Sequence, residues 1–133
     1  MTRKLARDFV FKLLYQSEIQ KEKTKYIFDI ASQNKDIDEK SRAYIINTIE
    51  GIENNADAIN ALISDKSMGW KIERLSKITL ASLTIGVYEI LFNDDIPDTV
   101  AINEAVALAK TYEGEEAAGY VNGVLSSVLK GKN

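Results

Sequence analysis

The stretch from Leu75 to Phe92 constrains the fold of this chain more than any other. From Ile78 onward, apolar residues occupy almost every side of a helical projection, and a helix that is apolar all round must be buried on several faces. Polar interruptions make the run too short for the ~20 apolar residues of a membrane span. Strands usually run ~5 residues, and this stretch has no internal turn signal, so it is too long for a strand. We therefore predict a central helix that amphipathic neighbours cover.

Amphipathic patterns lie on both sides of this stretch. Thr2 is a suitable N-cap for the first of them, and Asp36 or Asp38 can cap a longer helix that bends or breaks at Gly51 or at the Asn54–Asn55 pair. Apolar residues recur at helical spacing over residues 3–20, 26–34, 43–63, 100–112 and 115–128. The sequence thus predicts an all-α fold of six or seven helices without a strand.

Size and composition limit the possible functions. The 133 residues fit one domain, spanning 1–133. Neither cysteine nor histidine occurs, so the usual nucleophile–base pairs and the commonest metal ligands are missing. We expect no enzymatic activity, no metal and no cofactor. The N-terminal segment lacks the apolar core of a signal peptide, and we expect a cytoplasmic protein without a membrane partner.

The net charge of −3 hides an asymmetry. Residues 1–25 hold seven Lys and Arg side chains against three carboxylates, a local net charge of +4. Residues 93–116 hold seven carboxylates against Lys110 alone. A basic end and an acidic patch on one small domain can serve two different partners. The alternative is that both are simply solvated faces.

The cations of the first predicted helix occupy an unusual place. Arg3, Lys4 and Arg7 stand in its first turns, where the helix dipole disfavours positive charge. Phosphate groups would relieve the repulsion and accept from the free N–H groups there. In the last predicted helix, Tyr120 fits either a core position or an aromatic that stacks on an RNA base.

Several segments carry a resemblance to a known family. They are DIP at 95–97, VAINEAV at 100–106, LAK at 108–110 and YVNGVL at 120–125, together with RKLAR at 3–7, LY at 14–15 and VYEIL at 87–91. In this combination the chain closely resembles the NusB family of bacterial transcription antitermination factors. The resemblance implies two three-helix subdomains around a long central helix.

The resemblance also implies a function and a set of contacts. NusB-like proteins bind single-stranded boxA RNA together with NusE, a small-subunit ribosomal protein, within the RNA polymerase antitermination complex of ribosomal RNA operons. The implied RNA-binding residues are Arg3, Lys4, Arg7, Lys110, Tyr112 and Tyr120. The implied partner-binding residues are Tyr15, Glu89 on the central helix, and Glu116 near the RNA edge.

Some positions depart from the family pattern. Thr79 stands where the central helix usually carries an acid, and Thr84 where it usually carries an Arg. Tyr112-Glu113 replaces a Phe-Gly pair. These departures bear on the NusE interface more than on the RNA edge. An alternative function is a helical protein interaction module whose basic edge is covered by self-association, as in a homodimer. A role in RNA modification would require a separate catalytic protein.

Overall fold

The computed structural model describes residues 1–132, and within them it contains seven α-helices, one 3-10 turn and no strand. The all-α prediction is therefore confirmed. The elements are α1 (Arg3–Gln20), α2 (Thr24–Ala31), α3 (Glu39–Asn54), α4 (Ala56–Lys66), the 3-10 turn η1 (Ile72–Arg74), α5 (Lys77–Phe92), α6 (Asp98–Tyr112) and α7 (Glu115–Lys130).

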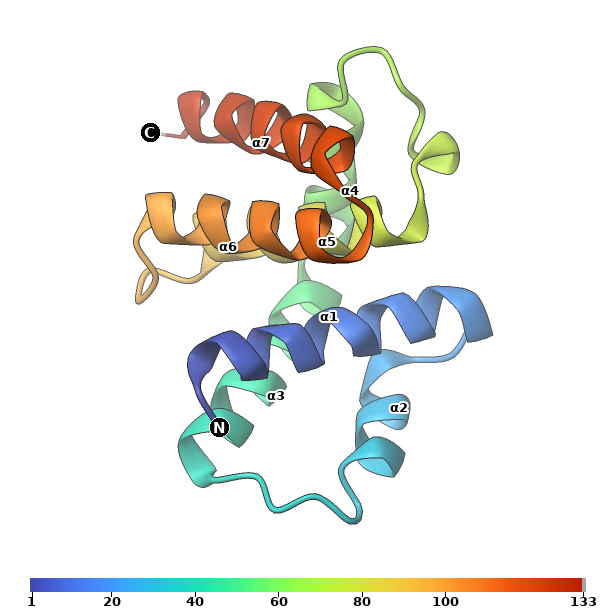
Figure 1. Ribbon diagram of the computed structural model, residues 1–133, viewed down its shortest axis with the longest axis vertical. Coiled ribbons are helices and arrows are strands. Elements are labelled where there is room, and N and C mark those ends of the chain that lie inside the picture. The colour runs from blue at the N-terminus through green and yellow to red at the C-terminus, as the bar shows by residue number, and fades with distance from the viewer. Residues whose placement is uncertain (133) are drawn as a thin grey trace.

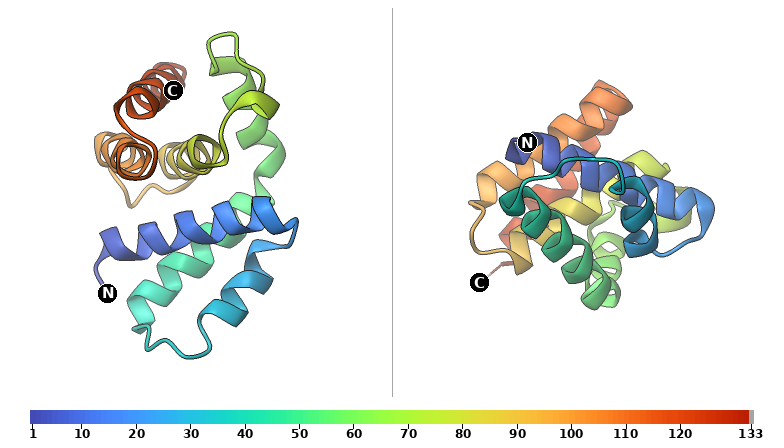
Figure 2. Two further views of the ribbon diagram at one scale, coloured as in Figure 1. Left: turned by 45° about the vertical axis from the view of Figure 1, so that its right-hand side comes forward. Right: turned by 90° about the horizontal axis from the view of Figure 1, so that it is seen from below.

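The helices form two groups (Figure 1). Helices α1, α2 and α3 make one group and α5, α6 and α7 the other, while α4 rises from the end of α3 alongside the second group (Figure 2). The predicted central helix is α5, which contacts α1, α3, α4, α6 and α7. Its buried side chains point in every direction, as expected of a helix that is apolar all round.

Side-chain caps fix where three helices begin. The Thr2 hydroxyl accepts from the Leu5 N–H at 3.1 Å, and the Asp38 carboxylate accepts from the Ser41 N–H at 3.1 Å. Asp38, rather than Asp36, is therefore the cap of α3. Ser76 caps α5, which is why that helix begins two residues later than the apolar stretch in the sequence.

The long helix predicted over residues 43–63 is interrupted at Asn55. The Asn55 side chain donates to the Gly51 carbonyl at 2.8 Å and ends α3, and α4 begins at the next residue. Gly51 has a different role. A Cβ built there would lie 2.3 Å from Tyr88 Cε1, so Gly51 lets α3 and α5 approach closely.

Across residues 1–132, no helix is both long enough and apolar enough to cross a lipid bilayer.

Candidate functional site

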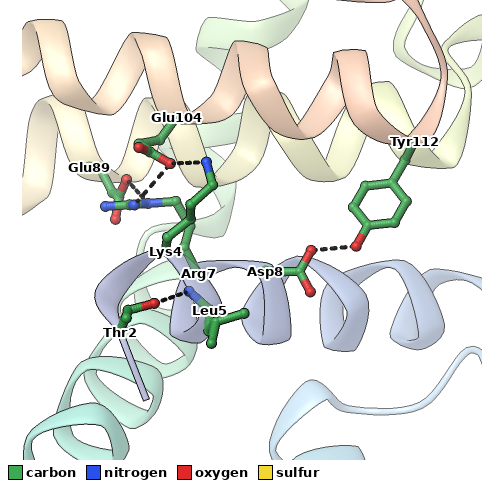
Figure 3. Close-up of polar contacts among 8 residues, drawn as sticks. All are labelled: Thr2, Lys4, Leu5, Arg7, Asp8, Glu89, Glu104 and Tyr112. Atoms are coloured by element: carbon green, nitrogen blue, oxygen red, sulfur yellow. Dashed lines mark hydrogen bonds and ion pairs between the residues drawn. The ribbon is translucent and has the colours of Figure 1, made fainter.

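A groove of about 290 Å³ lies between α1 and α6. Its lining includes Lys4 and Arg7 from α1, Tyr112 from the end of α6, and the carboxylates of Asp8 and Glu104. Figure 3 shows Lys4 and Arg7 pointing from α1 toward Glu104, and Asp8 pointing toward Tyr112. The groove thus brings together three of the six residues for which an RNA contact was expected.

The inner end of this groove is a buried ionic cluster. The Arg7 side chain is only 3% exposed and its Nε donates to Glu89 Oε1 at 2.9 Å. Glu89 is fully buried, and its second oxygen accepts from the Tyr44 hydroxyl at 2.6 Å. Arg7 Nη1 also lies 3.6 Å from Glu104 Oε2. The cluster joins α1, α3, α5 and α6.

The electrostatics of the cluster explain why its charges persist. Burial opposes the charge on Arg7, but the charge and hydrogen bond of Glu89, together with Tyr44 and Glu104, outweigh it and raise the pKa of the guanidinium. Burial, together with the Glu89 charge, raises the pKa of the Tyr44 phenol far above its usual range. A buried pair whose partners are both hydrogen-bonded avoids the cost of an uncompensated charge.

The position of Arg7 and Glu89 departs from the expectation that both side chains contact a ligand. Each is enclosed by protein and bonded to the other, so neither presents a charge to RNA or to a partner protein in this structure. The positive charge of Arg7, in the first turns of α1, is compensated by Glu89 inside the protein. Arg7 therefore positions α1 and does not lie on its outer surface.

Arg3 and Lys4 remain on the surface. The Lys4 side chain is 72% exposed and its Nζ lies 3.5 Å from Glu104 Oε2. Breaking such an exposed ion pair costs little free energy. The Arg3 guanidinium lies 4.3 Å from the centre of the Tyr44 ring. A cation over an aromatic face keeps its charge available to a second ligand.

Tyr112 closes the other end of the groove. Its ring stacks on Phe11, with 5.0 Å between the ring centres, and its hydroxyl donates a short hydrogen bond to Asp8. Lys12 Nζ lies 3.1 Å from Asp8 and 5.8 Å from the centre of the Tyr112 ring. The hydrogen bond to Asp8 raises the pKa of Tyr112 and that of Lys12. Tyr112 is therefore an oriented, partly exposed aromatic beside a cation.

The remaining expected RNA contacts lie apart from this groove. Lys110 pairs with Glu115 at 3.1 Å across the turn between α6 and α7. Tyr120 and Glu116 line a different pocket, where the Tyr120 hydroxyl donates to the Ser67 carbonyl at 2.8 Å. Tyr120 is half-buried and packs against the core, and its stacking on an RNA base stays a prediction.

The expected partner face contains Tyr15, whose side chain is exposed near the end of α1. Ile19, one turn later, is also exposed. Thr84 lines a neighbouring groove of about 190 Å³ between α1, α4 and α5. Thr79 is buried and its hydroxyl donates to Glu113 at 2.7 Å. Two of the positions that depart from the family pattern, 79 and 113, are thus in direct contact.

Sequence reasoning missed Tyr44, Asp8 and Glu104 as members of the site. Asp8 had a local signal, since Lys12 follows it at the i+4 spacing that favours an ion pair. Tyr44 and Glu104 had none, because their partners come from distant parts of the chain.

The groove is lined by charged and aromatic side chains. Within residues 1–132, no three carboxylates converge as metal ligands would. What the groove offers is the exposed Lys4 at one end and an oriented aromatic ring at the other, which suits a flexible polyanion with bases.

Comparisons with known proteins agree with this fold. Residues 4–130 match the model of the NusB family. The curated transcription antitermination protein NusB of Acetivibrio thermocellus is 43% identical over 132 residues, covering 99% of this chain and 91% of that protein. A solved structure of T. maritima NusB has a TM-score of 0.92 at 34% identity and covers 98% of this chain and 92% of that chain. A crystal structure of antitermination factors NusB and NusE in complex with dsRNA has a TM-score of 0.88 at 27% identity, covering 98% and 97%.

Proposed function

This chain belongs to the NusB family, and on that premise we propose that it is a transcription antitermination factor that binds boxA-like RNA together with NusE. Relatives that match nearly its whole length are named transcription antitermination proteins. A similar chain has been crystallised with NusE and RNA. The role is that of a non-enzymatic adaptor, one domain over residues 1–133, acting in the bacterial cytoplasm in ribosomal RNA operons.

The observation that carries the proposal is the α1–α6 groove, which has the exposed Lys4 and the buried Arg7 at one end and an aromatic ring at the other. We assign the phosphate contacts to Arg3 and Lys4, and a base contact to Tyr112. Lys110, which pairs with Glu115 outside this groove, stays a predicted RNA contact. Arg7 supports these contacts from within, because its bond to Glu89 fixes the first turns of α1.

The small number of exposed cations explains why a partner is needed. Each neutralised phosphate contributes to the salt dependence of RNA affinity, and two or three such contacts give only modest binding. A second protein that extends the binding surface would raise affinity and specificity together. We assign NusE to the face around Tyr15, with Glu116 near the boundary between the two ligands.

Fluorescence anisotropy of labelled boxA-like RNA across a salt series, with and without NusE, tests the proposal. We expect NusE to strengthen binding and a scrambled RNA to bind more weakly. The variant Arg3→Ala/Lys4→Ala should weaken binding and lower the slope of log affinity against log salt by about 2. Its matched control is Lys21→Ala/Lys25→Ala, which removes two cations outside the groove.

Equal losses in the two double variants would contradict the placement of RNA in the groove. Absence of RNA binding under every condition, combined with a stable dimer by light scattering, would instead support the interaction module. Under that outcome the basic edge is an interface between two copies of the chain.

A further inference from the structure

The lining of the α1–α6 groove holds as many carboxylates as cations. Each cation in the groove or at its edge is also paired with a carboxylate. The pairs are Lys4 with Glu104, Arg7 with Glu89, and Lys12 with Asp8. A phosphate that enters the groove must therefore displace a carboxylate from its cation, or remain close to a negative charge that repels it.

Glu104 and Glu89 carry charges that the fold requires. Glu89 is fully buried against Arg7. Glu104 lies 3.5 Å from Lys4 and 3.6 Å from the buried Arg7. If Lys4 moves to a phosphate, Glu104 thus keeps a cation partner inside the protein. Both carboxylates compensate a buried guanidinium, and removing either charge would disturb the core.

Asp8 has a different position. Its side chain is 25% exposed, and Lys12, whose side chain is 59% exposed, is the one cation within ion-pair distance of it across residues 1–132. One Asp8 oxygen lies 3.1 Å from Lys12 Nζ, and the other accepts from the Tyr112 hydroxyl (Figure 3). No buried cation therefore depends on Asp8. Its two oxygens instead hold an exposed cation and the aromatic side chain at one end of the groove.

We propose that Asp8 limits the RNA affinity of this chain by competing with the RNA backbone for Lys12 and by repelling phosphate from the Tyr112 end of the groove. The inference rests on the proposed function, which places RNA in this groove. Lys12 lies beside the Tyr112 ring, so a nucleotide stacked on that ring would bring its phosphate near both Lys12 and Asp8. An exposed ion pair is weak enough for a phosphate to break, but breaking it reduces the net gain from the contact.

The variant Asp8→Asn isolates the charge. The asparagine side chain keeps an oxygen that can accept from the Tyr112 hydroxyl, but it no longer binds Lys12 as an ion. Labelled boxA-like RNA is titrated by fluorescence anisotropy without NusE, across a salt series. We expect the variant to bind about three- to tenfold more tightly than the unsubstituted protein. The slope of log affinity against log salt should become steeper by about 1, because Lys12 is free to neutralise one more phosphate.

The matched control is Asp29→Asn. Asp29 pairs with Lys25 at 2.7 Å on α2, at the same four-residue spacing, and lies outside the groove. This variant removes one negative charge as Asp8→Asn does, so it measures the effect of net charge alone. We expect its RNA affinity to stay close to that of the unsubstituted protein.

A second variant tests the release of Lys12. Lys12→Ala should have little effect on RNA binding in the unsubstituted protein, where Asp8 already occupies the ammonium group. Combined with Asp8→Asn, it should remove the increase in the salt slope. Circular dichroism and urea denaturation of each variant verify that it is folded.

Several outcomes would overturn the inference. Asp8→Asn could bind RNA no more tightly than the unsubstituted protein, Asp29→Asn could gain as much affinity, or the steeper salt slope could persist without Lys12. Weaker binding by Asp8→Asn would mean that the carboxylate itself accepts a hydrogen bond from the RNA. If the unsubstituted protein binds no RNA even with NusE, the proposed function fails as well. If it binds and Asp8→Asn gains nothing, only this inference fails.

Discussion

Arg7 Nε lies 2.9 Å from Glu89 Oε1, although 82 positions separate the two residues in the chain. This contact ties the first turns of α1, which carry the exposed Arg3 and Lys4, to the central helix. The position of the proposed RNA edge therefore depends on a charge pair in the core.

Removing either member of this pair should be costly. Arg7→Ala leaves the fully buried Glu89 without its cation, and Glu89→Ala leaves Arg7 and the Tyr44 hydroxyl without their acceptor. We expect each change to lower the free energy of unfolding by about 3–5 kcal/mol, measured by urea denaturation. The double variant should cost less than the sum of the two, since they share one interaction. Single losses below about 1 kcal/mol would mean that water reaches the cluster.

Stability should also decline at alkaline pH because of Tyr44. Its folded pKa is raised above the ordinary value of 10.0 by burial and by the Glu89 charge. The unfolded phenol therefore loses its proton first, and the stabilisation present below pH 10 is lost as the pH rises further. We expect the loss between pH 9 and about pH 11 to be smaller in Tyr44→Phe than in the unsubstituted protein. Parallel losses in the two proteins would assign the effect to other tyrosines.

Substitution by alanine should have opposite effects on stability at Gly51 and at Gly119. Gly51→Ala drives a methyl group into the Tyr88 ring, and overpacking of this kind costs about 1–3 kcal/mol. A methyl group at Gly119 would meet no other part of the protein within 4 Å, so Gly119→Ala should stabilise by about 0.5–1 kcal/mol through helix propensity. Thermal unfolding of both variants checks the contrast, and Tyr88→Leu should rescue Gly51→Ala.

Two variants of Tyr112 distinguish the contribution of its ring to RNA binding from that of its hydroxyl. Tyr112→Phe keeps the ring stacked on Phe11 and loses only the bond to Asp8. Tyr112→Leu removes the ring. If the ring stacks on a base, the leucine variant should lose about 1–3 kcal/mol of RNA binding energy and the phenylalanine variant little. RNA titrations of both variants, with circular dichroism to verify folding, give the comparison. An equal loss in the two would assign the effect to the hydroxyl.

Much of the fold could be predicted because helical periodicity is a local signal. Helix α1 spans the predicted residues 3–20, and α3 ends at the predicted Asn54–Asn55 pair. The burial of Arg7 could also have been predicted from local spacing, although its charge favoured the prediction of an RNA contact. Arg7 precedes Val10 and Leu14 by three and seven positions, which places it on the apolar face of α1.

The partners of the site residues could not be predicted in the same way. Glu89 is the lone acid in a helix buried on all sides, which implies a buried partner without identifying it. Thr79 lies on α5 and Glu113 directly follows α6, so their contact joins parts of the chain that are 34 positions apart. No spacing pattern in the sequence predicts this contact. Such pairs depend on how the helices pack, which periodicity does not specify.

The central position of α5 has a consequence for synthesis. Helices α1 to α4 are translated before it, yet α1, α3 and α4 all pack against it. Until residue 89 leaves the ribosome, Arg7 has no buried carboxylate, and α1, α3 and α4 lack the helix against which they all pack. The N-terminal helices can therefore complete their packing only after more than half of the chain has been translated.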